Sequence, residues 1–308
     1  MKILITGAAG MLGSAIAQSL EGNSRHSVTG LSRSDLDLRD SRAFARKLLE
    51  IKPDVVFHTA ARVGGIQANI SEPVDFLASN LQMDTSVITG CLNADIGNFV
   101  YIGSSCMYPR SHRQPLVETD VLAGPLEPTN EGYAIAKIAG SKLCEYASTS
   151  MGVNYKTIVP SNLYGPGDNF QPGSSHLLAS IIRKVSAAKD NGSKTIEVWG
   201  SGEARREFTY IQDLSNWLAS SLNRLSELPA LLNVGAGIDH SIDEFYLIAM
   251  EAMGVQAELV HDLGMPEGMQ SKLMDSSLAR REHGWVTPTS LEIGIHETFQ
   301  WFQAQAGR

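Results

Sequence analysis

The first half of the chain alternates short apolar runs with segments whose apolar positions recur at helical spacing. Apolar runs without polar alternation predict strands buried on both faces, and the periodic segments between them predict covering helices. The expected strands are residues 2–6, 26–31, 54–60, 98–103 and 153–160, and the expected helices are 11–21, 40–52, 73–93 and 133–150. This order predicts an α/β fold with a doubly wound parallel sheet.

The pattern changes after Pro160. Residues 162–175 are rich in glycine, proline and asparagine and predict a long loop, with helices expected at 174–189, 211–225 and 290–305 and short strands at 195–200 and 231–237. We expect 211–225 and 231–237 to return to the first sheet. The predicted organisation is one domain of residues 1–164 plus about 210–237, and a smaller mixed α/β substrate domain of residues 165–209 and 238–308.

Composition and charge exclude several classes of protein. The 308 residues are 43% hydrophobic and 19% charged, as in an ordinary globular protein, and the net charge of -8 argues against nucleic-acid or membrane partners. Cys91, Cys106 and Cys144 form no closely spaced pair, which disfavours disulfides and a metal site and indicates a reducing, cytoplasmic location. Regular glycines interrupt the apolar start, which disfavours a signal peptide.

A glycine-rich stretch, GAAGMLG, lies between the first expected strand and the first expected helix. Glycines permit a tight turn and close approach to a diphosphate, and the helix start offers free N–H groups. The position of the motif predicts a dinucleotide site in a Rossmann-type sheet rather than a merely structural turn. The residues expected to hold the cofactor here are Gly7, Ala8, Ala9, Gly10, Met11, Leu12 and Gly13.

The end of the second expected strand bears on the choice of dinucleotide. It reads Ser32-Arg33 and lacks the leading carboxylate that usually binds the ribose hydroxyls of NAD. Arg33 could instead bind a 2′-phosphate, which favours NADP(H). The alternative, a solvated arginine, stays open because Asp35 and Asp37 follow closely. We expect Asp37 and Leu38 to border the adenine.

Tyr133 and Lys137 stand four residues apart on one face of an expected helix. A phenol ionises near pH ~10 in isolation, and a nearby ammonium lowers that pKa. Such a tyrosine can exchange a proton with a carbonyl or alcohol, while the lysine can bind the nicotinamide ribose. Alone, the pair could equally be an ordinary surface contact.

The stretch GSSCMYP, residues 103–109, follows another expected strand and contains the second cysteine. A free cysteine is usually a small buried apolar side chain. The alternative is a reactive thiol, because ligands of doubly wound folds bind beyond the carboxyl ends of the strands, where this stretch lies.

Together, the glycine loop, the Tyr133–Lys137 pair and a serine after a middle strand resemble the extended short-chain dehydrogenase/reductases. The resemblance implies a catalytic set of Ser104, Tyr133 and Lys137. It favours Ser104 over Ser105 because the superfamily places a tyrosine four residues after the serine, as Tyr108 does here.

Longer stretches resemble the GDP-L-fucose synthase family: AARVGGIQAN, GSSCMYP, LEPTNEGYAIAKIAGSKLCE, PSNLYGPGDNF, VWGSG and REF. The resemblance implies a homodimer, NADPH as reductant and a nucleotide-linked 4-ketosugar that is epimerised at C3 and C5 and then reduced at C4. The family's base and acid fall on Cys106 and His176, which favours a reactive Cys106. His176 could otherwise be a loop histidine that caps a helix, and we interpret His58 and His112 as structural.

Further positions follow from the same resemblance. The implied cofactor contacts are Ala60, Ala61, Pro160, Asn162, Leu163, His176 and Lys137, and the implied substrate contacts are Lys184, Trp199, Arg206, Glu267 and Lys272. Two places depart from the family pattern: Ala9 replaces an arginine, and residues 269–271 replace Thr-Pro-Arg. The alternatives are a related enzyme for another nucleotide ketosugar, such as a GDP-heptose, and a cofactor-binding protein without turnover, which the intact acid–base set disfavours.

Overall fold

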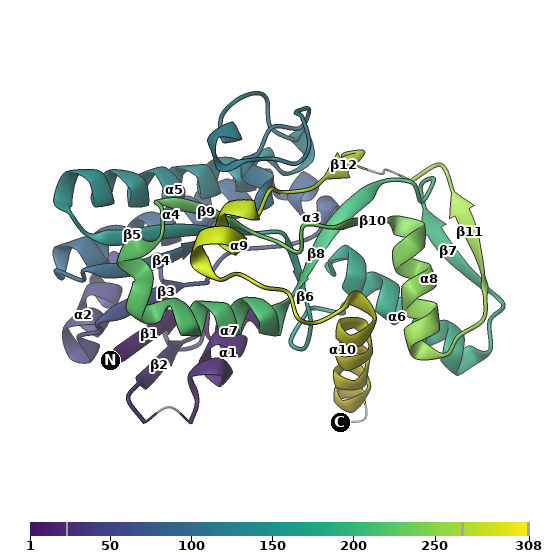
Figure 1. The fold of residues 1–308 in the computed structure, drawn as a ribbon, viewed down its shortest axis with the longest axis horizontal. Coiled ribbons are helices and arrows are strands. Elements are labelled where there is room, and N and C mark those ends of the chain that lie inside the picture. The colour runs from purple at the N-terminus through teal and green to yellow at the C-terminus, as the bar shows by residue number, and fades with distance from the viewer. Residues whose placement is uncertain (23, 266–267, 307–308) are drawn as a thin grey trace.

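The computed structural model describes residues 1–22, 24–265 and 268–306. Its largest sheet has six strands, and every neighbouring pair is parallel, which confirms the doubly wound prediction (Figure 1). In spatial order the strands are β2 (Ser27–Leu31), β1 (Lys2–Thr6), β3 (Val55–His58), β4 (Asn98–Ile102), β5 (Asn154–Pro160) and β9 (Leu231–Val234).

Helices cover both faces of this sheet. On one face, α2 (Ser41–Ile51), α4 (Pro73–Asn93) and α5 (Glu131–Met151) pack side by side, and on the other α1 (Met11–Leu20) packs against α7 (Ile211–Ser221) (Figure 1). The predicted helix at 73–93 is confirmed with the same bounds, as is the return of 211–225 and 231–237 to the sheet. Apolar side chains from both faces exclude water around the strands.

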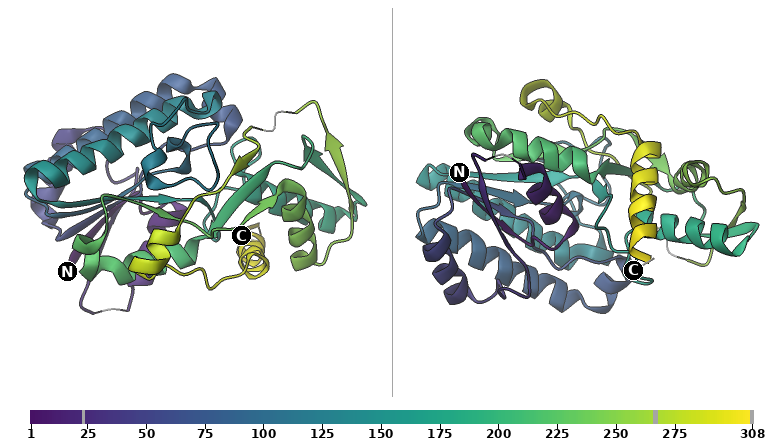
Figure 2. Two further views of the ribbon diagram at one scale, coloured as in Figure 1. Left: turned by 45° about the horizontal axis from the view of Figure 1, so that its top comes forward. Right: turned by 90° about the horizontal axis from the view of Figure 1, so that it is seen from below.

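A smaller part of the molecule lies beside the sheet (Figure 2). Its centre is β8 (Arg205–Tyr210), which pairs with β10 (Asp239–Ser241), β12 (Ser271–Lys272) and β6 (Asn162–Tyr164). A second pair joins β7 (Thr195–Trp199) to β11 (Glu258–Asp262). The accompanying helices are α6 (Leu177–Asn191), α8 (Ile242–Met253) and α10 (Leu291–Ala306).

The last third of the chain crosses back to the large sheet before it ends. Helix α9 (Ser277–His283) packs on β9, and Trp285 beyond it meets Trp217 of α7 with ring centroids 5.8 Å apart. One continuous core joins the two parts of the molecule. The domain bounds given above stay a prediction.

The structure adds short elements that the pattern did not predict. They include the strands β6, β8, β10, β11 and β12, the helix α3 (Ile66–Ser71), and the 3₁₀ turns η1 (Ser105–Met107), η2 (Glu118–Asp120), η3 (Pro128–Asn130) and η4 (Leu222–Glu227). The helix expected from 174 begins at Leu177, so His176 is its N-cap residue. Within the described residues, no helix is long and apolar enough to cross a membrane.

Candidate active site

The glycine loop joins β1 to α1 at the carboxyl edge of the large sheet. Gly7 has φ +75°, and a Cβ on it would lie 2.6 Å from the amide nitrogen of Ala60. A Cβ on Gly13 would lie 2.3 Å from the carbonyl oxygen of Gly7. Because Gly10 caps α1 without a side chain and no acidic residue stands in the first turn, the helix start is free for a diphosphate. The loop therefore fits a dinucleotide.

The residues expected around the adenine lie directly after β2. Arg33 is exposed, and it lies near enough to Asp37 to lower the pKa of that carboxyl. The pKa of Asp37 falls to about 2, chiefly because Arg39 donates to it, with Nη2 2.7 Å from Oδ2. Asp37 is thus an ionised partner of Arg39, while Leu38 is buried.

The other expected cofactor contacts lie at or just beyond the carboxyl ends of β3 and β5. Ala60 touches the glycine loop, Ala61 follows it, and Pro160 ends β5. The amide of Asn162 donates to the carbonyl of Glu207 at 3.0 Å, which ties β6 to β8, and Leu163 packs on the core beside it. Sheet topology explains the gathering, because parallel strands bring their carboxyl ends to one edge.

Ser104, Tyr133 and Lys137 come together from β4 and α5. Ser104 hydrogen-bonds Tyr133 and also accepts from the amide of Cys106 at 3.2 Å. Burial raises the pKa of Tyr133, as do Cys106 and Asp84, against the effect of the Ser104 hydrogen bond. The prediction that Lys137 lowers this pKa is wrong for the structure as described. The Lys137 ammonium lies 6.0 Å from the Tyr133 ring centroid. A buried carboxylate oxygen lies only 3.9 Å from the same ammonium.

That carboxylate is Asp84 of α4, which the sequence reasoning missed. It is 1% exposed and lies 3.9 Å from the ammonium of Lys137 and 2.9 Å from Nε2 of His58, and it accepts from Tyr101. Burial opposes ionisation, but these contacts lower the pKa of Asp84 overall. His58 is thus structural, as expected: its Nδ1 lies 2.6 Å from the hydroxyl of Thr6. The one sequence signal for Asp84 was its place on the buried face of the helix predicted at 73–93.

Cys106 lies in η1, half-buried, with cationic and amide groups around its sulfur. The Asn130 amide nitrogen is 3.1 Å from Sγ, and the Lys272 ammonium is 4.0 Å from it. Arg206 is also close, since Cys106 raises its pKa against the larger, lowering effect of burial. Positive charge of this kind favours a thiolate. The other two cysteines are fully buried, and burial raises the pKa of each.

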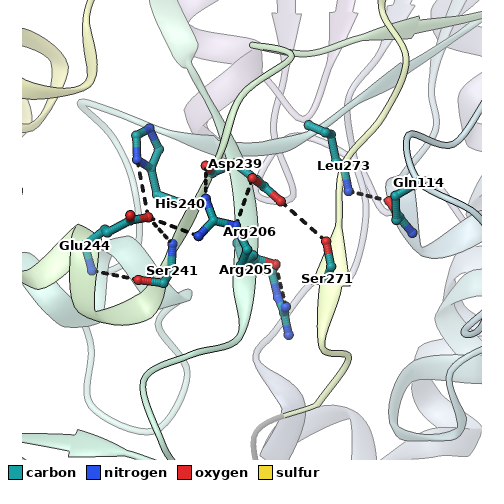
Figure 3. A network of polar contacts seen from close by, with 9 residues as sticks. All are labelled: Gln114, Arg205, Arg206, Asp239, His240, Ser241, Glu244, Ser271 and Leu273. Carbon is teal, nitrogen blue, oxygen red and sulfur yellow. Dashed lines mark hydrogen bonds and ion pairs between the residues drawn. The ribbon is translucent and has the colours of Figure 1, made fainter.

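Strand β12, which carries Lys272, is attached to the chain on both sides (Figure 3). The Ser271 hydroxyl donates to Asp239 at 3.4 Å, and the Leu273 amide donates to Gln114 at 2.8 Å. Lys272 itself pairs in register with Arg206 of β8. Lys272 and Arg206 are therefore held on adjacent strands. Arg205, next to Arg206, forms an ion pair with Asp239 at 3.0 Å.

His176 precedes α6, and its side chain makes no capping hydrogen bond. His176 therefore occupies the N-cap position, as the capping interpretation expected, but its side chain does not cap the helix. His176 instead interacts with Asp168, whose pKa burial raises while His176 opposes the rise.

Lys184 and Trp199 form a separate pair at the far end of the smaller part. The Lys184 ammonium lies 5.4 Å from the ring centroid of Trp199 and donates to the carbonyl of Glu197 at 2.8 Å. Trp199 is 45% exposed, which leaves its ring available to a ligand. Glu267, the remaining expected contact, lies outside the described residues.

A glycine loop on a parallel sheet, with tyrosine, lysine and serine at the carboxyl edge, defines a nucleotide-cofactor oxidoreductase of the short-chain type. The chain belongs to the NAD-dependent epimerase/dehydratase family, whose model matches residues 3–235. Among curated relatives, GDP-L-colitose synthase of Yersinia pseudotuberculosis is 41% identical over 98% of each chain. GDP-L-fucose synthase of Azorhizobium caulinodans is 42% identical over 98% of this chain and 96% of its own.

Solved structures agree with this assignment. A GDP-mannoheptose C4 reductase from Campylobacter jejuni, solved with NADP bound, superposes with a TM-score of 0.88. It is 30% identical and covers 98% of each chain.

Proposed function

We propose that the protein is an NADPH-dependent epimerase-reductase that converts GDP-4-keto-6-deoxy-D-mannose to GDP-L-fucose. The observation that carries the proposal is the position of Cys106, beside both the Ser104–Tyr133 pair and the ammonium of Lys272. A ketone reductase needs a proton donor but no thiol, whereas an epimerase needs a base that acts at carbon. The name of the Azorhizobium relative supports the sugar, and the names of both relatives support the guanine base.

The proposed reaction begins with proton transfers next to the C4 ketone. The Cys106 thiolate removes a proton from a carbon beside the ketone, and His176 returns one from the opposite face. Ser104 and Tyr133 hydrogen-bond the ketone oxygen and stabilise its enolate form. NADPH, when bound, would supply the hydride for C4, and Tyr133 would donate its proton to the resulting alkoxide. Because the pKa of Tyr133 is raised, the phenol would hold that proton until the alkoxide forms.

The buried network beneath Tyr133 positions the lysine. Asp84 favours the charged form of Lys137, which would bind the nicotinamide ribose, although burial lowers the pKa of that lysine. Arg206 and Lys184 bind the diphosphate of the substrate in this proposal, and Trp199 packs against its nucleoside.

Cofactor, assembly and location complete the proposal. Exposed Arg33 binds the 2′-phosphate of NADPH, in line with the NADP-bound heptose reductase. We expect a homodimer, because Ile135, Tyr146 and Met151 leave apolar side chains exposed on α5. Three free thiols fit a cytoplasmic location.

The test is a reaction in deuterated water with NADPH and GDP-4-keto-6-deoxy-D-mannose. NADPH loss is followed by absorbance, and deuterium at C3 and C5 by NMR of the product. We expect both carbons to carry deuterium. Cys106→Ser should lower exchange by about 10²–10⁴-fold while reduction at C4 survives. The proposal would be refuted if the wild type showed no NADPH loss and no deuterium exchange.

A second candidate is a related enzyme for another GDP-linked ketosugar. Similar proteins include a GDP-L-colitose synthase and a GDP-mannoheptose reductase, which are named for other GDP-linked sugars. Residues 269–271 also differ from the pattern of the fucose synthases. Exchange at a single carbon, or faster turnover of a heptose substrate, would favour this candidate.

A further inference from the structure

Asn130 occupies the N-cap position of α5 yet does not cap the helix. Asparagine is among the preferred N-cap residues because its side-chain oxygen accepts from the first free N–H groups. Here the N-cap side chain makes no such bond. Its amide nitrogen instead lies 3.1 Å from the sulfur of Cys106. The side chain has therefore exchanged a common stabilising role for a contact with the thiol.

The other end of the same amide points to a use beyond packing. Oδ1 of Asn130 is buried and has no hydrogen-bond partner among the described residues. An unpaired buried carbonyl is costly, so proteins seldom keep one without a reason. Rotating the Asn130 amide by a half-turn would place Oδ1 instead of Nδ2 beside the sulfur. Asn130 can thus donate N–H to a thiolate in one orientation and accept S–H from a thiol in the other.

We propose that Asn130 is a positioning residue for Cys106, whose amide orients the sulfur and stabilises its thiolate by a hydrogen bond. The inference rests on the proposed function, because removing a proton from carbon makes Cys106 alternate between a thiolate and a thiol. A hydrogen bond that serves both protonation states suits such a group. It also complements the charges, since Lys272 and Arg206 favour the thiolate alone.

Among the residues that the structure describes, four groups interact with Cys106. Asn130 comes from the start of α5, Tyr133 from its first turn, Arg206 from β8 and Lys272 from β12. Tyr133 stays neutral over the working range because its pKa is raised. A change in the titration of Cys106 on substitution of Asn130 therefore reports the amide itself.

The test measures thiolate formation in the full-length protein from pH 5 to 10, by the absorbance difference near 240 nm between each variant and its Cys106→Ser counterpart. The difference isolates Cys106, since both other thiols are present in each member of a pair. Asn130→Ala should raise the midpoint by about one pH unit, the size expected for losing a hydrogen bond to a charged group. Asn130→Asp should raise it further, because a carboxylate would lie against the sulfur.

Asn130→Ser separates the two possible roles. Serine is a good N-cap residue, and its short side chain does not reach the sulfur. A capping role predicts that Ser and Asp preserve wild-type behaviour, whereas the proposed role predicts midpoints in the order wild type, Ser and Ala together, then Asp. Asn98→Ala, which removes an amide bonded to the carbonyl of Asp54, is the matched control and should leave the midpoint unchanged.

Catalysis gives a second readout. In deuterated water, Asn130→Ser should shift the pH profile of exchange upward by the same amount and leave hydride transfer to C4 nearly unchanged. Wild-type midpoints in both the Ser and Asp variants would overturn the inference. Because the titration needs no substrate, its outcome is separate from that of the proposed function, which is tested by exchange and NADPH loss in the wild type.

Discussion

Glu207 offers a test of the electrostatics of β8, the strand that also carries Arg206. It is 1% exposed, and its two oxygens accept from the amides of Gly237 at 2.6 Å and Met274 at 2.9 Å. Burial raises its pKa to about 7 despite these hydrogen bonds. The carboxylate thus braces the chain two residues beyond Lys272, and ionising it in the folded state has an energetic cost.

The sign and size of that cost follow from linkage. An unfolded glutamate ionises near pH ~4.5, so between there and pH ~7 the folded state binds more protons than the unfolded state. Stability contributed at this position therefore falls as pH rises through that window and is constant above it. A shift of about 2.5 units at 1.36 kcal/mol each corresponds to about 3 kcal/mol.

Glu207→Gln removes the titration and keeps the size of the side chain. The variant places an amide against one backbone N–H, which adds an offset that does not depend on pH. Urea unfolding, followed by tryptophan fluorescence with refolding as the check of reversibility, should be run on both proteins from pH 4.5 to 8. Between pH ~4.5 and pH ~7, the free energy of unfolding of the wild type should fall by about 3 kcal/mol relative to that of the variant.

The control for this experiment is Glu50→Gln, which removes an exposed carboxylate paired with Lys47. Its stability should parallel the wild type at every pH, because exposed pairs contribute little. A constant difference between the wild type and Glu207→Gln across the range would refute the reasoning. It would mean that the two backbone amides compensate fully for burial.

Three further predictions concern cofactor and proton donor. Arg33→Ala should raise KM for NADPH about 10–100-fold, the value of a lost charge-assisted hydrogen bond, and leave NADH unaffected; equal changes for both cofactors would contradict it. Gly13→Ala should cost about 1–3 kcal/mol and weaken NADPH binding by calorimetry, because its Cβ meets Gly7, whereas Gly97→Ala, in open space, should do neither. Tyr133→Phe should lower NADPH oxidation about 10²–10⁴-fold while deuterium exchange continues, and unchanged oxidation would remove Tyr133 from the reaction.

The sequence predicted the parts of the fold that depend on local pattern. Helix α4 was expected at 73–93 and has those bounds, because a proline begins it and its apolar period is unbroken. The glycine loop could be predicted because the backbone constraints that require glycine lie within the turn itself. The short β6 and α3 were missed because tertiary pairing stabilises segments too brief to show a period.

The candidate site divides along the same line. Tyr133 and Lys137 could be predicted as neighbours because four residues separate them on one helix. The pKa of Tyr133 could not, because Asp84 comes from another helix and takes up the lysine charge. Nor does any pattern show that Lys272 lies 4.0 Å from Cys106, 166 residues away in the chain.

The two halves of the proposed chemistry come from two parts of the structure. The large sheet supplies the reductase groups, since Ser104 and Tyr133 stand at its carboxyl edge. The smaller part supplies the cations beside Cys106, since Arg206 and Lys272 lie on β8 and β12. A thiol on the large sheet alone would lack the positive charge that favours a thiolate. In the proposed reaction, epimerisation therefore depends on how β12 is attached to the rest of the chain. We expect Gln114→Ala or Asp239→Ala to lower deuterium exchange more than hydride transfer.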